Sequence, residues 1–180
     1  MTTTTTTRWT TARRAVAGVL VMTATTTVLA GCVLRGPDTA APGRTEPTVD
    51  ADTAKQQMIE AVDDATERLG GEWKARTGPD YPEDCELEDG TPGAQWRSLT
   101  GSTLEGSPDE DATRMEEHWK SRGMQVVRRE SSDGPAVIGS GGGKIASISA
   151  YAYPGNYTVQ AVSLCFPGNA DDIAEDLSGE

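Results

Sequence analysis

Apolar residues recur at helical spacing in a segment that begins at Asp50 or Asp52. Successive apolar positions lie three or four residues apart, while acidic and amide side chains occupy the opposite face. Gly70 and Gly71 follow the last apolar position and are typical of a helix end. The pattern therefore predicts an amphipathic helix over about residues 50–69, whose apolar face consists of Ala54, Met58, Ala61, Val62, Ala65 and Leu69.

A second helix is predicted from Ser107 to about Arg122. Ser107 and Glu110 have the spacing of a capping box, and Pro108 suits the first turn of a helix. Gly123 is a natural stop at the other end. Its apolar face is formed by Ala112, Met115 and Trp119.

The remaining apolar residues alternate with polar ones, as in β-strands. We expect strands over residues 94–100, 124–130, 136–138, 144–153 and 157–166, the last two forming a hairpin. The prolines and glycines of residues 72–93 predict turns, with a short strand around Cys85 and Leu87. After Pro167 the chain either forms a short helix or frays. This order predicts an α+β fold, an antiparallel sheet of about four to five strands with two helices packed on one face.

The first 31 residues have the features of an export signal. Arg8, Arg13 and Arg14 precede an apolar run that ends at Gly31, and no acidic residue occurs before Asp38. The run is shorter than the roughly 20 residues that a permanent transmembrane helix needs. We therefore interpret residues 1–31 as a cleavable signal peptide. The Arg13-Arg14 pair leaves both the general and the twin-arginine export routes open.

The apolar run ends in Leu29-Ala30-Gly31-Cys32, which resembles the lipobox of bacterial lipoproteins. The resemblance implies that a diacylglyceryl group alkylates the Cys32 thiol and that cleavage occurs before this residue. The small side chains of Ala30 and Gly31 would give the peptidase access. The membrane is then a partner through the lipid anchor, and the protein is expected on the extracytoplasmic face of the cell membrane.

Residues 32–49 predict a disordered linker after the lipidated cysteine, because they are rich in proline and glycine and have no apolar period. Residues 50–180 are then expected to form a single α+β domain. In this plan, with Cys85 and Cys165 further along, the chain resembles small envelope lipoproteins of actinobacteria. That resemblance implies no particular activity.

Cys85 and Cys165 remain as a pair if Cys32 carries the lipid. Exported proteins fold in oxidising compartments, so we predict a disulfide between these two residues. A thiol nucleophile is the alternative, but it needs a nearby general base. His118 is the single histidine of the chain, and we interpret it as a solvated helix residue.

Composition excludes some function classes. The chain has 16 Lys and Arg against 28 Asp and Glu, a net charge of −12, which argues against a nucleic-acid partner. No His or Cys set has zinc-ligand spacing, and the acid pairs do not follow a calcium loop, so no metal or other cofactor is expected. The glycine-rich run from Gly139 to Lys144 departs from the phosphate-loop spacing and predicts a flexible hairpin turn.

Three tyrosines surround the turn at residues 154–156, namely Tyr151, Tyr153 and Tyr157. They form either an exposed aromatic surface for recognition or ordinary edge packing. Our first hypothesis for function is a non-catalytic binding or interaction module of the cell envelope, its partner an envelope component or a protein. The alternatives are a small envelope hydrolase that uses two carboxylates, and a carrier with an apolar cavity between helices and sheet.

Overall fold

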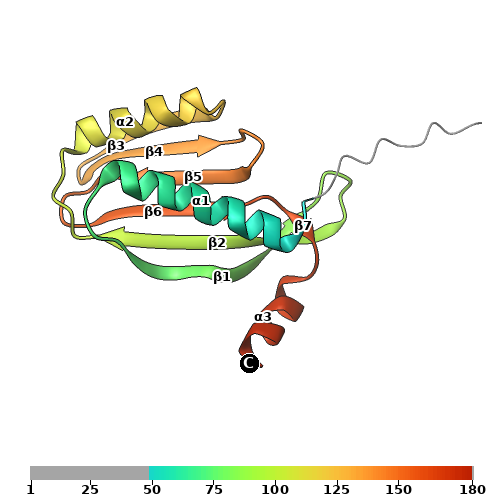
Figure 1. Ribbon diagram of the computed structural model, residues 1–180. Helices are drawn as coiled ribbons and strands as arrows, with labels where there is room; N and C mark the ends of the chain where they lie inside the picture. Colours follow the sequence, from blue (N-terminus) through green and yellow to red (C-terminus); the bar gives the residue numbers. More distant parts are fainter. Residues whose placement is uncertain (1–48, 180) are drawn as a thin grey trace, which may run out of the picture. The chain divides into compact units, whose positions relative to one another are not determined.

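The computed structural model describes residues 49–179 (Figure 1). The predicted signal peptide 1–31, the lipidation site Cys32 and nearly all of the linker 32–49 lie outside the described residues. Within residues 49–179, no helix is both long and apolar enough to cross a membrane.

Helix α1 spans Ala51–Leu69, and its bounds agree with the periodicity of the sequence. The Asp50 carboxylate caps it by accepting a hydrogen bond of 2.8 Å from the backbone N–H of Thr53. Gly70 follows with a φ of 74°. The predicted apolar stripe faces the sheet, where Met58 and Ala65 are fully buried.

Helix α2 spans Pro108–Ser121, also as expected, but the predicted capping box is wrong. The Ser107 side chain makes no capping hydrogen bond. The backbone N–H of Ser107 instead donates to Oδ2 of Asp111 over 2.9 Å. The carboxylate that bonds to the N–H of Ser107 is therefore that of Asp111, one residue after Glu110. The Asp111 side chain is buried rather than solvated.

The sheet is antiparallel throughout and confirms the α+β class, but it has seven strands rather than four or five (Figure 1). Their spatial order is β1-β2-β6-β5-β4-β3, and β7 pairs with β2 beyond the end of β6. The strands are β1 Lys74–Glu86, β2 Pro92–Ser102, β3 Gln125–Ser131, β4 Gly134–Ser140, β5 Ile145–Tyr151, β6 Tyr157–Ser163 and β7 Phe166–Pro167.

Strand β1 is the main departure from the sequence-based expectation, which placed turns in this region. Pro79 and Pro82 lie within it, and its pairing with β2 shifts register on either side of Thr77. Because β1 is an edge strand, a missing N–H need not break the sheet. Gly78 has a φ of 79°, and a Cβ there would lie 2.2 Å from the Arg97 carbonyl oxygen. Glycine is thus required at this position of β1, because any side chain would collide with the backbone of β2.

The C-terminal segment forms a third helix, α3, over Ala170–Ser178. The side chain of Asn169 caps it by accepting from the N–H groups of Asp171 and Asp172. α3 contacts β1 and β2. The segment after Pro167 therefore forms a helix rather than fraying. The fold prediction of two helices is thus one too few for residues 49–179.

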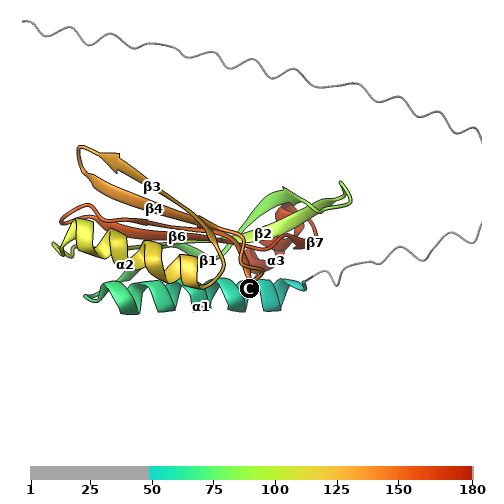
Figure 2. The same cartoon turned by 90° about the horizontal axis from the view of Figure 1, so that it is seen from above.

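Helices α1 and α2 lie on the same face of the sheet, as Figure 2 shows. Between these helices and the sheet the core contains large side chains that are almost fully buried, including Met58, Trp96, Met115, Ile148 and Phe166. The Trp96 indole N–H donates to the carbonyl oxygen of Ala51 over 2.9 Å. This bond joins the start of α1 to β2.

The predicted disulfide between Cys85 and Cys165 is confirmed. Cys85 lies near the end of β1 and Cys165 immediately precedes β7, with a Cα–Cα distance of 6.0 Å. The bond ties the edge strand to the chain segment that returns across β2.

Candidate functional site

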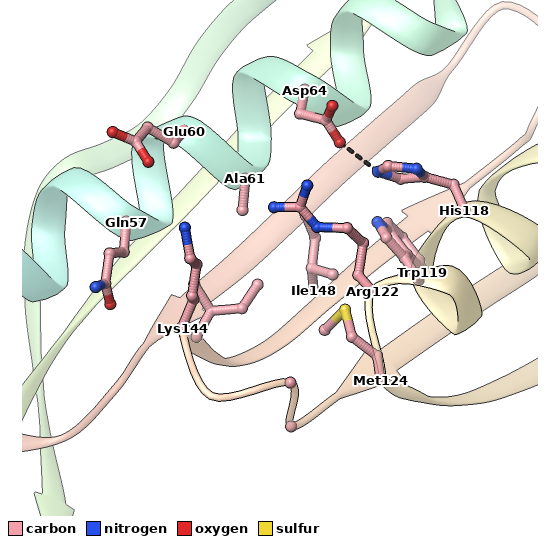
Figure 3. A pocket seen from close by; sticks show the side chains of 13 residues that line it. Gln57, Glu60, Ala61, Asp64, His118, Trp119, Arg122, Met124, Lys144 and Ile148 are labelled. Atoms are coloured by element: carbon pink, nitrogen blue, oxygen red, sulfur yellow. Dashed lines mark hydrogen bonds and ion pairs between the residues drawn. The ribbon is translucent and has the colours of Figure 1, made fainter.

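A surface groove lies between α1, the C-terminal end of α2 and the turn that joins β4 to β5. It contains about 560 Å³ of atom-free space, part of which is open to solvent. Figure 3 shows the side chains that line it. They are Gln57, Glu60, Ala61 and Asp64 from α1, His118 and Trp119 from α2, Arg122 and Met124 after it, and Gly141, Gly142, Lys144, Ile145 and Ile148 from the β4–β5 region.

His118 and Asp64 meet at one side of this groove. Nε2 of His118 lies 2.5 Å from Oδ2 of Asp64, and the imidazole is only 11% exposed. The interpretation of His118 as a solvated helix residue is therefore wrong. It follows Glu117 on the outer surface of α2, but its ring turns inward between the two helices (Figure 3). The pair fixes the spacing of α1 and α2 at the groove.

The pKa of Asp64 lies below its ordinary value of 3.8. Partial burial opposes ionisation of this carboxyl, but hydrogen bonds from Arg68 and His118 outweigh that effect. Arg68 approaches Oδ1 of Asp64 from the next turn of α1 at 3.2 Å. The Asp64 carboxylate is thus ionised and engaged by two neighbours.

Two cations extend into the groove from the opposite side. In Figure 3, the guanidinium group of Arg122 and the amine of Lys144 both reach toward α1. Neither forms an ion pair within the described part of the chain, where most other Lys and Arg side chains do, namely Lys55, Arg68, Arg97, Arg114, Lys120 and Arg128.

The floor of the groove is apolar. Trp119 and Ile148 are buried beneath it, and Met124 and Ala61 are partly buried beside them. Gly142 has a φ of 84°, and a Cβ at this position would lie 3.0 Å from Cγ of Met124. The glycine turn therefore approaches Met124 in a way that a larger residue would disturb, and the predicted flexible turn becomes one wall of the groove.

Gln57 lies at the α1 side of the groove, next to Lys144 in Figure 3. Its side-chain oxygen is buried and accepts no hydrogen bond from residues 49–179. A buried acceptor without a donor costs about 1–3 kcal/mol. Gln57 thus places a buried amide on the Lys144 side of the groove.

The three tyrosines do not form one exposed surface. Tyr157 is buried, and its hydroxyl donates to Oδ2 of Asp111 over 2.9 Å. Burial, and next the Asp111 carboxylate, raise the pKa of this phenol well above its usual range. Tyr151 and Tyr153 remain partly exposed and contact each other edge-on, with ring centroids 5.7 Å apart. A recognition role stays a prediction for these two alone.

The acid pairs noted in the sequence do not gather into a metal site among residues 49–179, where no cluster of three or more His, Cys, Asp and Glu has suitable geometry.

The groove itself was not predicted from the sequence. Asp64 and His118 each precede a buried position, Ala65 and Trp119, but no sequence pattern predicts that these two helix positions face each other.

No protein-family model and no curated protein matches this chain. Among solved structures it is similar to a crystal structure of a DUF4853 family protein from Actinomyces odontolyticus. The TM-score is 0.50 at 16% sequence identity, over 75% of this chain and 78% of that one. At this level of identity the likeness concerns the fold alone.

Proposed function

We propose that this chain is an exported lipoprotein, anchored through Cys32 to the outer face of the cell membrane, whose folded part is a non-catalytic binding module. The sequence Leu29-Ala30-Gly31-Cys32 after a basic and apolar leader supports the anchor. A Cys85–Cys165 disulfide suits an oxidising compartment. If the 17 residues between Cys32 and Asp50 form the expected linker, they would span on the order of 20–25 Å and hold the domain clear of the lipid.

The observation that carries the binding role is the groove between α1, α2 and the β4–β5 turn. It combines an apolar floor with a few polar groups that converge above it, which is the usual arrangement of a small-molecule site. The His118–Asp64 pair fixes the two helices that form its walls. A site held in this way need not reorganise to accept a ligand.

The two alternative functions find less support in the groove. A carboxylate-dependent hydrolase needs an acid with a raised pKa, whereas the pKa of Asp64 is lowered. A carrier of apolar ligands needs a cavity lined by aliphatic side chains. The groove is instead bordered by Glu60, Arg122 and Lys144, and it favours a polar or charged ligand.

Metabolic labelling with a radioactive fatty acid tests the anchor. The wild-type chain and Cys85→Ser are expected to incorporate label, and Cys32→Ala is expected to lose it and to leave the membrane fraction. Cys85→Ser is the matched control, because it removes a different cysteine. Equal labelling of wild type and Cys32→Ala would refute lipidation at this residue.

A further inference from the structure

We infer that the groove binds a small organic carboxylate, with the carboxylate between Arg122 and Lys144 and an apolar group on the floor beneath them. The inference rests on the proposed binding function and names the chemical class of its ligand. It follows from the cations beside the floor, the chemistry of the floor and the Gln57 amide.

Five Lys and Arg side chains among residues 49–179 have no ion pair, and two of these, Arg122 and Lys144, line the groove. Acidic residues outnumber Lys and Arg by 28 to 16, so most cations have a carboxylate within reach. Arg122 and Lys144 come from different segments, yet they extend toward the same space without an ion pair among residues 49–179 (Figure 3). Two like charges that face one space repel each other, and an anion between them removes the repulsion.

The acids of the groove do not neutralise this pair. Asp64 is already engaged by Arg68 and His118. Glu60 is exposed on α1, where it accepts a hydrogen bond of 3.3 Å from Gln56. Neither acid forms an ion pair with Arg122 or Lys144 among residues 49–179, so both cations can pair with a ligand anion.

The floor distinguishes an organic carboxylate from an inorganic anion. Ala61 and Met124 are only partly buried and offer apolar surface beside the cations, and burying a methyl or methylene group there contributes about 0.8 kcal/mol per carbon. A planar guanidinium such as that of Arg122 can donate two parallel hydrogen bonds to a carboxylate. Phosphate would satisfy the charges but leave the floor uncovered.

Gln57 adds a third element of recognition. Its amide lines the same groove and can both accept and donate hydrogen bonds. N-acetylalanine carries a carboxylate, a methyl group and an N–H, one for each of these elements. It therefore serves as the probe, and N-acetylalaninamide, which lacks the negative charge, is its matched control.

The test is a titration of the full chain in detergent, followed by amide chemical shifts in two-dimensional NMR. N-acetylalanine is expected to shift the signals of residues 141–144 and of Ala61 with a saturating, millimolar dependence, and N-acetylalaninamide to bind at least tenfold more weakly. No saturable shifts in the groove would overturn the inference. Equal binding of the amide, or tighter binding of inorganic phosphate, would also overturn it.

Charge removal locates the site. Arg122→Gln and Lys144→Gln, both at exposed side chains, are each expected to weaken binding about tenfold, which corresponds to one lost charge-assisted hydrogen bond. Lys74→Gln removes an equally exposed cation outside the groove and should leave affinity unchanged. If all three variants weaken binding equally, the probe responds to overall charge and the groove assignment is wrong.

The test of ligand binding and the test of lipid anchoring are independent of each other. The titration reports on the groove whether or not Cys32 carries a lipid. If Cys32 is labelled but N-acetylalanine does not bind, the proposed ligand class is refuted and the lipid anchor is still supported. If N-acetylalanine binds but Cys32 is not labelled, the lipid anchor is refuted and the proposed ligand class of the groove is still supported.

Discussion

The imidazole of His118 and the carboxylate of Asp64 lie 2.5 Å apart although 54 residues separate them in the chain. The contact joins α2 to α1 beside the groove and completes a hydrogen-bonded set in which Arg68 holds the other carboxylate oxygen. The same carboxylate thus positions one wall of the proposed binding site and contributes to stability.

Asp64→Asn should make stability less dependent on acid pH. Because the folded state lowers the pKa of Asp64, its contribution is complete above the ordinary value of 3.8 and is lost as pH falls through the lowered value. We expect Asp64→Asn to lower the free energy of unfolding at pH 6, and the difference from wild type to shrink as the pH falls below the ordinary value of 3.8. Urea denaturation at a series of pH values measures it.

Asp63→Asn is the control for this experiment, because Asp63 is exposed on the adjacent position of α1. It should change the free energy of unfolding by less than about 0.5 kcal/mol at any of these pH values. A constant difference between wild type and Asp64→Asn from pH 7 to pH 2 would contradict the assigned role of the Asp64 charge.

Tyr157→Phe should destabilise the fold by about 1.5–3 kcal/mol, since the lost hydroxyl donates to a buried carboxylate. Asp111 keeps its bonds from Ser107 and Arg114, so the protein should remain folded. Tyr151→Phe, at a partly exposed ring, should change stability little. Chemical denaturation compares the three proteins, and equal stability of all three would show that the Tyr157 hydroxyl does not contribute.

Gly106→Ala should be more harmful than alanine at another glycine of similar backbone conformation. Gly106 has a φ of 55°, and a Cβ there would lie 2.4 Å from the Tyr157 hydroxyl oxygen and 2.6 Å from Oδ2 of Asp111. Gly90 also has positive φ but has open space around it. We expect about 1–2 kcal/mol of destabilisation for Gly90→Ala from the backbone alone, and clearly more for Gly106→Ala. Equal thermal midpoints would refute the steric argument.

Removal of the disulfide by the double substitution Cys85→Ala and Cys165→Ala should lower the free energy of unfolding by about 4 kcal/mol. The bond closes a loop of 80 residues and so reduces the conformational entropy of the unfolded chain. Without the bond, the unfolded chain regains this entropy and becomes more favourable. Guanidinium denaturation of oxidised wild type, reduced wild type and the double variant gives the value. An unchanged midpoint would mean that the bond does not constrain the unfolded state.

The elements with a strong local signal could be predicted from the sequence, and those that depend on distant partners could not. Helix α1 has a periodic apolar face and an aspartate cap, so its bounds follow from residues that lie within it. The disulfide followed from the number of cysteines and the expected compartment. By contrast, β1 contains Pro79 and Pro82 and becomes a strand through its long pairing with β2. No residue pattern within β1 itself predicts its pairing with β2.

The groove depended on tertiary structure in the same way. His118 has ordinary charged neighbours on α2, and only the packing of α2 beside α1 brings Asp64 to it. Tyr157 appeared similar to Tyr151 and Tyr153 in the sequence. It differs because alternation along β6 turns it toward α2, where Asp111 is buried. The face that each side chain occupies was decided by sheet register and helix packing.

The central claim is that Cys32 becomes the lipidated first residue of an exported protein. Mass spectrometry of the N-terminal peptide from membrane-purified protein tests this claim most directly. The account predicts a peptide that begins at Cys32 and carries a diacylglyceryl group. A peptide that retains residues 15–31, with an unmodified thiol at Cys32, would contradict it.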